Sequence, residues 1–100
     1  MGLKNTTYCY GYQQVAAGGT VAAFGLTIPS APGNSPTAPT YAIIQAEAQA
    51  LRWRDDGVDP TTTVGMTIPA GGELRYDGDL KKIRLINATA GAIANISYYA

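Results

Sequence analysis

The fold class is decided by residues 62–99, which read TTVGMTIPAGGELRYDGDLKKIRLINATAGAIANISYY. Short runs of β-branched and aromatic residues are separated there by the turn sequences PAGG (69–72), DG (77–78) and AG (90–91). This punctuation is typical of an all-β sandwich or barrel. It predicts strands over residues 62–68, 73–76, 80–87 and 92–99, with the DG pair as the turn of a β-hairpin.

The N-terminal part of the chain has similar punctuation. Strands are expected over residues 7–15 and 20–28, with a turn at Gly18 and Gly19 between them. Residues 29–39 contain four prolines, which remove backbone donors and exclude a helix or a central strand. This segment is therefore expected to be an exposed loop.

Residues 41–54 are ambiguous. Their Ala, Gln, Glu and Leu residues favour a helix, but an alternation with period two is also readable. The surrounding β context favours two strands, or one long strand bent near Ala48 and Gln49. The chain then has about eight strands in a single domain over residues 7–100, preceded by an N-terminal arm over residues 1–6.

A sequence echo suggests how the strands are arranged. Residues 25–29 read GLTIP and residues 65–69 read GMTIP, so a strand followed by proline and a loop occurs twice. Two copies of a hairpin-like unit would make a two-sheet jelly roll, although proline is also a common way to end a strand. The predicted fold is a single compact antiparallel β-sandwich or jelly-roll-like barrel.

Composition argues against several partners. Seven basic and seven acidic residues leave no net charge at neutral pH, whereas non-specific nucleic-acid binding depends on phosphate neutralisation by Lys and Arg. No apolar run approaches the roughly 18–20 residues of a membrane span, and the first residues lack the apolar core of a signal peptide. We therefore expect neither a nucleic acid nor a membrane as partner. A surface with so little charge favours assembly into an oligomer or a larger particle.

The residue types needed for common catalytic sites are missing. The chain has no histidine and one cysteine, so no Ser–His or Cys–His pair and no ordinary zinc site can form. Two aspartate clusters could offer oxygens to calcium: Asp55, Asp56 and Asp59, and Asp77 and Asp79. Neither has the spacing of a calcium loop, and aspartate commonly caps turns. We expect no enzyme activity, no cofactor and no metal, and the single cysteine fits folding in a reducing cytoplasm.

Residues 52–57 read RWRDDG and hold four of the 14 charged side chains around the only tryptophan. In a strand, Trp53 lies on the face opposite Arg52 and Arg54. With Trp53 inward, both arginines are available for carboxylates. Pairing inside the subunit and pairing across a subunit interface, where Trp and Arg are enriched, both remain open. The internal candidates are Asp55, Asp56 and Asp77.

Tyrosines form a second candidate surface. Alternation in the strand over residues 7–15 puts three of them on one face, with Cys9 on the other as a small buried group. Tyrosines could stack on sugars or bases, but protein contact fits the absence of net charge better. The candidate interface residues are therefore Tyr8, Tyr10, Tyr12, Arg52, Trp53, Arg54, Asp55 and Asp56.

Several short motifs point to a known group of proteins. They are YAIIQAEAQALRWRDDG (41–57), DPT (59–61), TVGM (63–66), GDL (78–80), IR (83–84) and NISYY (95–99). Over about the last 60 residues, the chain resembles small tailed-bacteriophage virion proteins of about this length, and RWRDDG is a fairly specific tag of them. The resemblance implies a β-sandwich like that of capsid decoration or cement proteins, which clamp neighbouring capsid subunits, commonly as trimers. It supplies no catalytic residues.

The expected function is therefore that of a structural virion protein, which decorates or cements a bacteriophage capsid by binding between shell subunits. The expected partners are the major capsid protein or other virion proteins, and further copies of the chain in a homo-oligomer such as a trimer. The expected location is the virion, after synthesis in the host cytoplasm. A tail, collar or fibre component is a close alternative. A small carbohydrate-binding module that uses the tyrosines and Trp53 is an alternative from another class.

Overall fold

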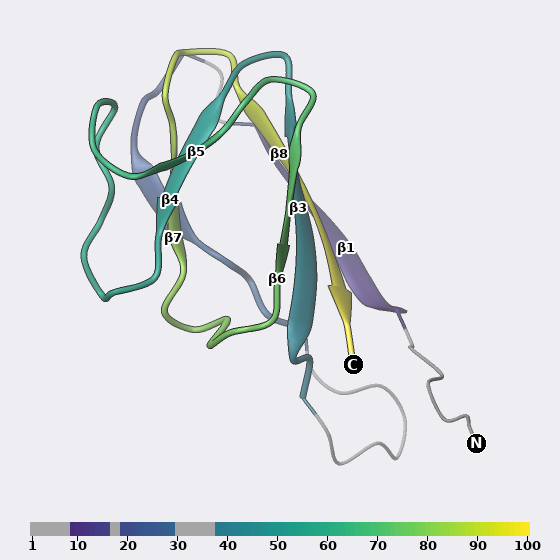
Figure 1. The fold of residues 1–100 in the computed structure, drawn as a ribbon. Coiled ribbons are helices and arrows are strands. Elements are labelled where there is room, and N and C mark those ends of the chain that lie inside the picture. Colours follow the sequence, from purple (N-terminus) through teal and green to yellow (C-terminus); the bar gives the residue numbers. More distant parts are fainter. Residues whose placement is uncertain (1–8, 17–18, 30–37) are drawn as a thin grey trace.

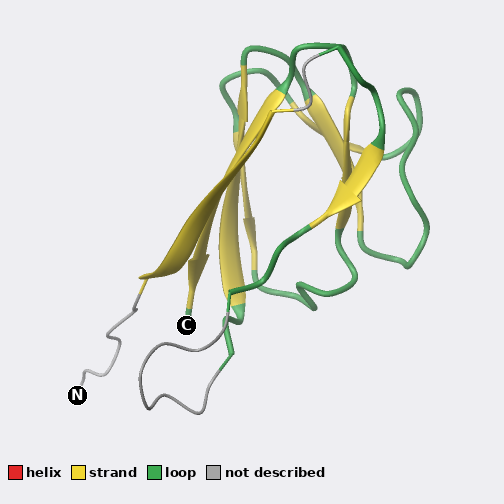
Figure 2. Ribbon diagram, turned by 180° about the vertical axis from the view of Figure 1, so that it is seen from behind, coloured by secondary structure: helices red, strands yellow, loops and turns green. Residues whose placement is uncertain are grey.

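The computed structural model describes residues 9–16, 19–29 and 38–100, in which no helix is long and apolar enough to cross a membrane. These residues form strands and loops in two layers, as Figure 1 and Figure 2 show. The strands are β1 (Cys9–Ala16), β2 (Ala23–Gly25), β3 (Tyr41–Glu47), β4 (Leu51–Arg54), β5 (Met66–Ile68), β6 (Glu73–Tyr76), β7 (Arg84–Asn87) and β8 (Ile93–Tyr99). They make two four-stranded antiparallel sheets, ordered β1-β8-β3-β6 and β2-β7-β4-β5. The predicted all-β sandwich is confirmed.

The order of pairing makes this sandwich a jelly roll. β1 pairs with β8, β2 with β7, β3 with β6 and β4 with β5, as in one long hairpin folded into two layers. Pairs of β3 with β8 and of β4 with β7 join the middle of each sheet. Eight strands wound in this way are the jelly-roll arrangement. The predicted jelly-roll-like fold of about eight strands is confirmed.

The core lies between the sheets and is built from alternate residues of the central strands. Among the most completely buried are Ala42, Ile44 and Ala46 of β3 and Ala94, Ile96 and Tyr98 of β8. This period of two explains why a segment rich in helix-forming residues is a strand, since burying alternate side chains between two neighbouring strands outweighs local propensity. The prediction of two strands over residues 41–54 is confirmed, and Ala48, with a φ of 72°, lies between them.

The predicted hairpin at Asp77 and Gly78 is wrong. β6 pairs with β3 in one sheet and β7 pairs with β2 and β4 in the other, so residues 77–83 cross between the sheets. The DG sequence favours a tight turn locally. On the way across, however, Leu80 and Ile83 bury their side chains in the core. This burial favours the crossing over a short hairpin.

Three predicted strands are shorter than expected, and the sequence echo is not a structural repeat. The strands expected over residues 20–28, 62–68 and 80–87 are reduced to β2, β5 and β7. In the second copy of the echo, residues 66–68 form β5. In the first copy, Gly25 ends β2 and residues 26–29 lie outside any strand. The jelly-roll prediction is right although the echo does not support it.

A bulge in β1 overturns the predicted tyrosine face. The register with β8 shifts between Cys9 and Gly11, so Tyr10 is an extra residue on β1. A bulge re-aims the side chains around it. Tyr10 accordingly packs against the core, whereas Tyr12 is 63% exposed. The prediction that Cys9 is buried is also wrong, because its side chain is exposed.

Some predictions fall outside the described residues. These are the arm over residues 1–6, Tyr8 of the tyrosine strand, Gly18 of the first turn, and Pro32 and Pro36 of the proline-rich loop. Pro29 and Pro39, at the two ends of that loop, are described, and neither lies in a strand.

Candidate functional site

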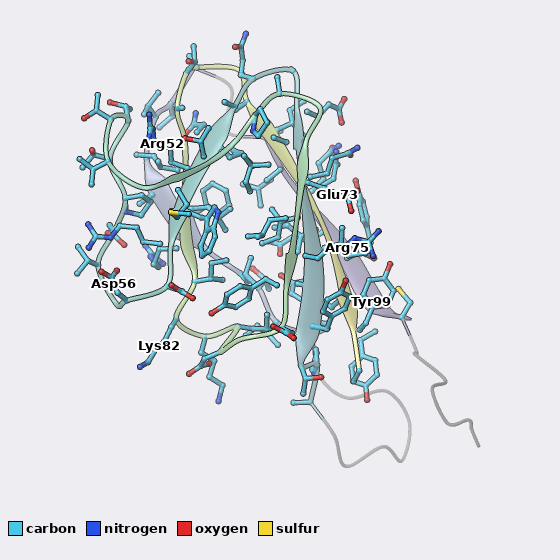
Figure 3. All side chains as sticks on the ribbon, viewed as in Figure 1. Arg52, Asp56, Glu73, Arg75, Lys82 and Tyr99 are labelled. Atoms are coloured by element: carbon cyan, nitrogen blue, oxygen red, sulfur yellow. The ribbon has the colours of Figure 1, made fainter. Side chains whose placement is uncertain are left out.

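The predicted site residues fall on both sheets rather than on one surface. Residues 52–56 lie in β4 and at the start of the loop 55–65, whereas Tyr10 and Tyr12 lie in β1, an edge strand of the other sheet. We call the outer side of the β2-β7-β4-β5 sheet the covered face, because the loop 55–65 is fastened to it. The outer side of the β1-β8-β3-β6 sheet is the open face. In Figure 3, Arg52 and Asp56 mark the covered face, and Glu73, Arg75 and Tyr99 mark the open face.

Arg52 fastens the loop to the covered face. Its Nε donates to the carbonyl of Thr62 at 3.1 Å and its Nη1 to the carbonyl of Gly65 at 2.9 Å. Pro60, within the same loop, is buried. The guanidinium has five donors in a fixed plane, so one arginine can hold two points of the loop together. Arg52 thus binds carbonyls of its own chain rather than the carboxylate that the sequence suggested.

Two arginines stand side by side on the covered face, and each has a carboxylate from the loop. Arg54 of β4 is directly opposite Arg84 of β7, a pairing of like charges that is unfavourable unless neutralised. Arg54 donates Nε and Nη2 to the two carboxylate oxygens of Asp56, and Arg84 donates Nε to Asp59 at 2.7 Å. The hydrogen bond from Arg54 lowers the pKa of Asp56. Of the internal partners that the sequence offered for Arg54, Asp56 is the one that it binds.

Gly25 leaves room for Arg84 on the neighbouring strand. The two residues are opposite each other in the register of β2 and β7. A Cβ atom on Gly25 would lie 2.8 Å from Nη1 of Arg84. Glycine therefore lets the guanidinium lie close against β2 while Nε reaches the loop carboxylate.

Trp53 points the opposite way from its two arginine neighbours, as alternation predicted. It packs against the core and meets Tyr76 of β6 edge to face, with ring centres 5.9 Å apart and planes at 66°. The Tyr76 hydroxyl donates to Oδ2 of Asp55 at 2.8 Å. Burial, reinforced by this carboxylate, raises the pKa of Tyr76 to about 12. Because Trp53 and Tyr76 belong to different sheets, the RWRDDG motif ties the sheets together as well as holding the loop.

The loop presents apolar side chains to solvent. Val58, Val64 and Met66 are exposed by 50%, 50% and 61%. Beside them lies a groove of about 410 Å³, which we call the loop groove; it is lined by Arg54, Asp55, Asp56, Val64, Gly65 and Met66. Its charged side chains already have internal partners, so the side chains left for a binding partner are the apolar ones.

The open face carries two rows of side chains that cross all four strands. In register, the first row is Tyr12, Ser97, Ile43 and Arg75, and the second is Gln14, Asn95, Gln45 and Glu73. The middle of the first row is low because Ser97 is small. The result is a depression of about 250 Å³, which we call the open-face groove; it is lined by Tyr12, Ile43, Gln45, Glu73, Asn95 and Ser97.

Asn95 is the centre of a hydrogen-bond network on the open face. Its Oδ1 accepts from the Tyr12 hydroxyl and, at 2.9 Å, from Nε2 of Gln14. Its Nδ2 donates to Gln45 at 3.2 Å and to Glu47 at 2.8 Å. Such networks rigidify the side chains that they join. The polar groups along one side of the groove are therefore held in place before any ligand arrives.

Arg75 and two tyrosines form a second set of contacts on the open face, outside the lining of the groove. Nε of Arg75 donates to Glu73 at 2.8 Å, and Nη1 donates to the Tyr41 hydroxyl at 3.5 Å. These hydrogen bonds, first that to Tyr41, raise the pKa of Arg75. The Tyr41 ring is tilted against Tyr99, with centroids 5.9 Å apart. The β6 edge of the open face is thus a paired and ordered surface as well.

Of the predicted site residues that the structure describes, only Tyr12 lines the open-face groove. The others that line it were missed by sequence reasoning, although a signal for them exists. Ile43 and Gln45 on β3, and Asn95 and Ser97 on β8, alternate with buried residues and so face outward. Alternation gives the facing of each strand, but it does not say that β8 lies between β1 and β3.

The described part of the chain contains no group of three or more His, Cys, Asp and Glu residues that could hold a metal ion. No family model, no curated protein and no solved structure matches this chain. The function therefore has to be inferred from the loop groove and the open-face groove themselves.

Proposed function

We propose that this protein is a structural virion protein that decorates or cements a bacteriophage capsid by binding between shell subunits. The loop groove and the loop beside it carry the proposal, because Val64 and Met66 line the groove and Val58 is exposed on the loop, in a chain with few charged residues. Exposed apolar patches rimmed by polar residues mark protein contact sites. The resemblance to small tailed-phage virion proteins supports it, since the motifs between residues 41 and 66 include β4 and most of the loop.

The charges around the loop groove have partners already, which lowers the cost of covering them. Arg54 is bonded to Asp56, and Asp55 accepts from Tyr76. A paired ion keeps its partner when water is removed, whereas an unpaired ion loses its hydration without compensation. Arg52 holds the loop in place before binding, so little conformational entropy is lost on contact. A capsid subunit would bury the valine and methionine side chains against this ordered surface.

The proposed partners are the major capsid protein or other virion proteins at sites between subunits. A homo-oligomer such as a trimer would present several loop grooves at once. Once one groove is bound, the other grooves of the oligomer are held near their own binding sites at a raised effective concentration. The oligomer therefore binds the shell more tightly than a single copy does, although each groove makes the same contacts. The alternative location at the tail, collar or a fibre would use the same groove at low copy number.

Copy number in purified particles tests the location. Mass spectrometry should find the protein on the capsid in numbers on the same order as the major capsid protein, because cement sites repeat with the shell. A few copies per particle would favour the tail, collar or fibre instead. Absence from the particle would contradict both.

Introducing a positive charge at the surface tests the groove. Met66→Lys should weaken binding of the purified protein to shells that lack it by at least about 10-fold, because an unpaired charge would be buried. Val21→Lys is the matched control, since it adds the same charge at a valine that is 41% exposed and lies outside the loop groove. Equal loss in the two variants, or loss in neither, would contradict the assignment of the groove.

A further inference from the structure

The open-face groove has the size of a site for one sugar ring. Tyr12 on β1 and Glu73 on β6 stand three strand spacings apart, or about 14 Å. Ser97 and Ile43 make the floor between them. The volume of about 250 Å³ lies below the roughly 300–1,000 Å³ of pockets for drug-sized ligands. A single ring of a longer molecule would fit, with the rest of that molecule continuing over the open face.

The lining of the groove combines apolar and two-way polar groups. Tyr12 is 63% exposed, and an aromatic ring with a polar end suits a ligand that has both characters. The Asn95 amide already makes its four hydrogen bonds, to Tyr12, Gln14, Gln45 and Glu47, and so fixes the wall of the groove. The Nε2 group of Gln45 can donate to a ligand, and the Ser97 hydroxyl can donate and accept. A sugar ring presents C–H groups on its faces and hydroxyls, which also donate and accept, around its rim. The two sets of groups match without any charge on the ligand.

Charge on the open face argues against an anionic ligand. Arg75 is already bonded to Glu73 at 2.8 Å. Glu47 accepts from Asn95 and adds a further negative charge beside the network. A phosphate or an acidic sugar would therefore meet a weakly negative surface whose nearest cation is already paired, and an uncharged ligand avoids that repulsion.

The apolar area of the open face is too small for a protein interface. Five large hydrophobic side chains are exposed among the described residues, and of these only Tyr12 lines the open-face groove. Val58 and Val64 belong to the loop 55–65, and Met66 begins β5 directly after it. The energetic centre of a protein interface is a packed cluster of large side chains. In the open-face groove, Tyr12 and Ile43 are the apolar lining residues and the other four are polar or charged, so that cluster is absent.

We infer that the open-face groove binds an uncharged saccharide, with Tyr12 against the ring and Gln45 and Ser97 facing the hydroxyls. This site differs from the one that the sequence suggested for a carbohydrate-binding module. Trp53 and Tyr10 pack against the core, so neither offers a free ring face to a sugar. The inference goes beyond the capsid proposal and is independent of it, because the two grooves share no lining residue.

The test is a glycan array followed by titration in solution. The array should carry short oligomers of glucose, galactose, mannose and N-acetylglucosamine, together with sialylated and sulfated glycans as the anionic set. We expect binding to at least one uncharged oligomer and not to the anionic set. Tyr12→Ala should weaken that binding by at least about 10-fold. Ser97→Ile should abolish it, because a β-branched side chain suits the strand but fills the floor of the groove.

Two controls separate a lost site from a lost fold. Both variants should keep the unfolding midpoint of the wild type, and Met66→Lys, which lies outside the open-face groove, should bind the same oligomer as the wild type does. The inference is overturned if the protein binds none of the uncharged oligomers. It is also overturned if binding survives Ser97→Ile or is lost in Met66→Lys. None of these outcomes bears on capsid binding, which Met66→Lys tests separately.

Discussion

The covered face and the open face belong to one sandwich, but the chain places its charged side chains differently on them. On the covered face, Arg52 and Arg84 reach partners that are 10 to 25 residues away in the sequence. On the open face, mostly neutral amides bind one another across strands that are already paired. Contacts of the first kind fix the path of a loop, whereas those of the second kind fix only rotamers. Substitutions of these hydrogen-bonding residues should therefore change stability more on the covered face than on the open face.

The largest difference should come from replacing one aromatic residue of each sheet. Trp53→Ala removes a ring that packs against the core and against Tyr76, and should cost about 3 kcal/mol of unfolding free energy. Tyr12→Ala removes a ring that is 63% exposed and should stay within about 0.5 kcal/mol of the wild type. Urea unfolding of the two variants measures both. Comparable losses would show that the open face is part of the stabilising structure.

A pair of arginines gives the next largest effect. Arg52→Ala leaves the carbonyls of Thr62 and Gly65 without their charged donor, which should cost about 2 kcal/mol. Proteolytic cleavage within residues 55–65 should become faster at the same time. Arg75→Ala is the control on the open face, where the side chain is 64% exposed, and should leave both readouts unchanged. Faster cleavage without a stability loss would mean that Arg52 holds the loop but contributes little to the fold.

Fold class could be predicted from the sequence because burial of alternate side chains is a local property. The buried set Ala94, Ile96 and Tyr98 is visible in the sequence as every second residue, and the turn sequences around it limit the strand. The same holds for residues 41–47, once their alternation is given more weight than their helix propensity. The opposite facing of Trp53 and its arginine neighbours follows from this rule as well.

Pairing between distant segments could not be predicted. The DG pair at 77–78 has the local signature of a hairpin, yet the segment after it joins the other sheet. Arg84 binds Asp59, 25 residues away, and no local pattern links the two. The extra residue at Tyr10 changes the facing of its strand, because a shift of one residue exchanges the two faces. The open-face groove depends on such pairings, which is why most of it was missed.

Alkaline pH should lower the unfolding free energy by a smaller amount, through two buried phenols of the β1-β8-β3-β6 sheet. Burial raises the pKa of Tyr98 and of Tyr76 to about 12, against roughly 10 in an unfolded chain. The neutral phenols therefore contribute stability that is complete below pH 10 and is lost as the pH rises towards 12. The loss at pH 11 should be on the order of 1 kcal/mol for each phenol. Urea midpoints measured from pH 9 to 12 will show it.

Tyr76→Phe separates the two contributions. Tyr76 donates to Asp55 of the loop, whereas Tyr98 donates to Gln13 of β1 at 2.7 Å. The variant should lose stability at neutral pH and then show only about half of the alkaline loss, because one titrating phenol remains. An unchanged alkaline loss would assign the titration to groups other than Tyr76.

The smallest change in unfolding free energy is expected from a substitution at Gly25 of β2, which lies opposite Arg84 of β7. In Gly25→Ala, the new Cβ would lie 2.8 Å from Nη1 of Arg84, which is the far end of a flexible side chain. Alanine restricts the unfolded chain more than glycine, which favours folding by roughly 0.4–1 kcal/mol. Moving the guanidinium weakens its surface pair with Asp59, which is worth about 0–1 kcal/mol. The two terms nearly cancel, so urea unfolding should find a change within about 0.5 kcal/mol.

Gly11→Ala, in β1 of the other sheet, is the matched control for this balance. Its new Cβ would make only ordinary contact with Pro29, at 3.6 Å. This variant should therefore show the full increase in unfolding free energy, roughly 0.4–1 kcal/mol, that comes from restricting the unfolded chain. The difference between the two variants then measures the contact of Arg84 with β2. Equal gains would mean that this contact contributes nothing. A loss above about 1 kcal/mol in Gly25→Ala alone would exceed what a surface ion pair supplies, and would place Arg84 beside Arg52 among the residues that hold the loop.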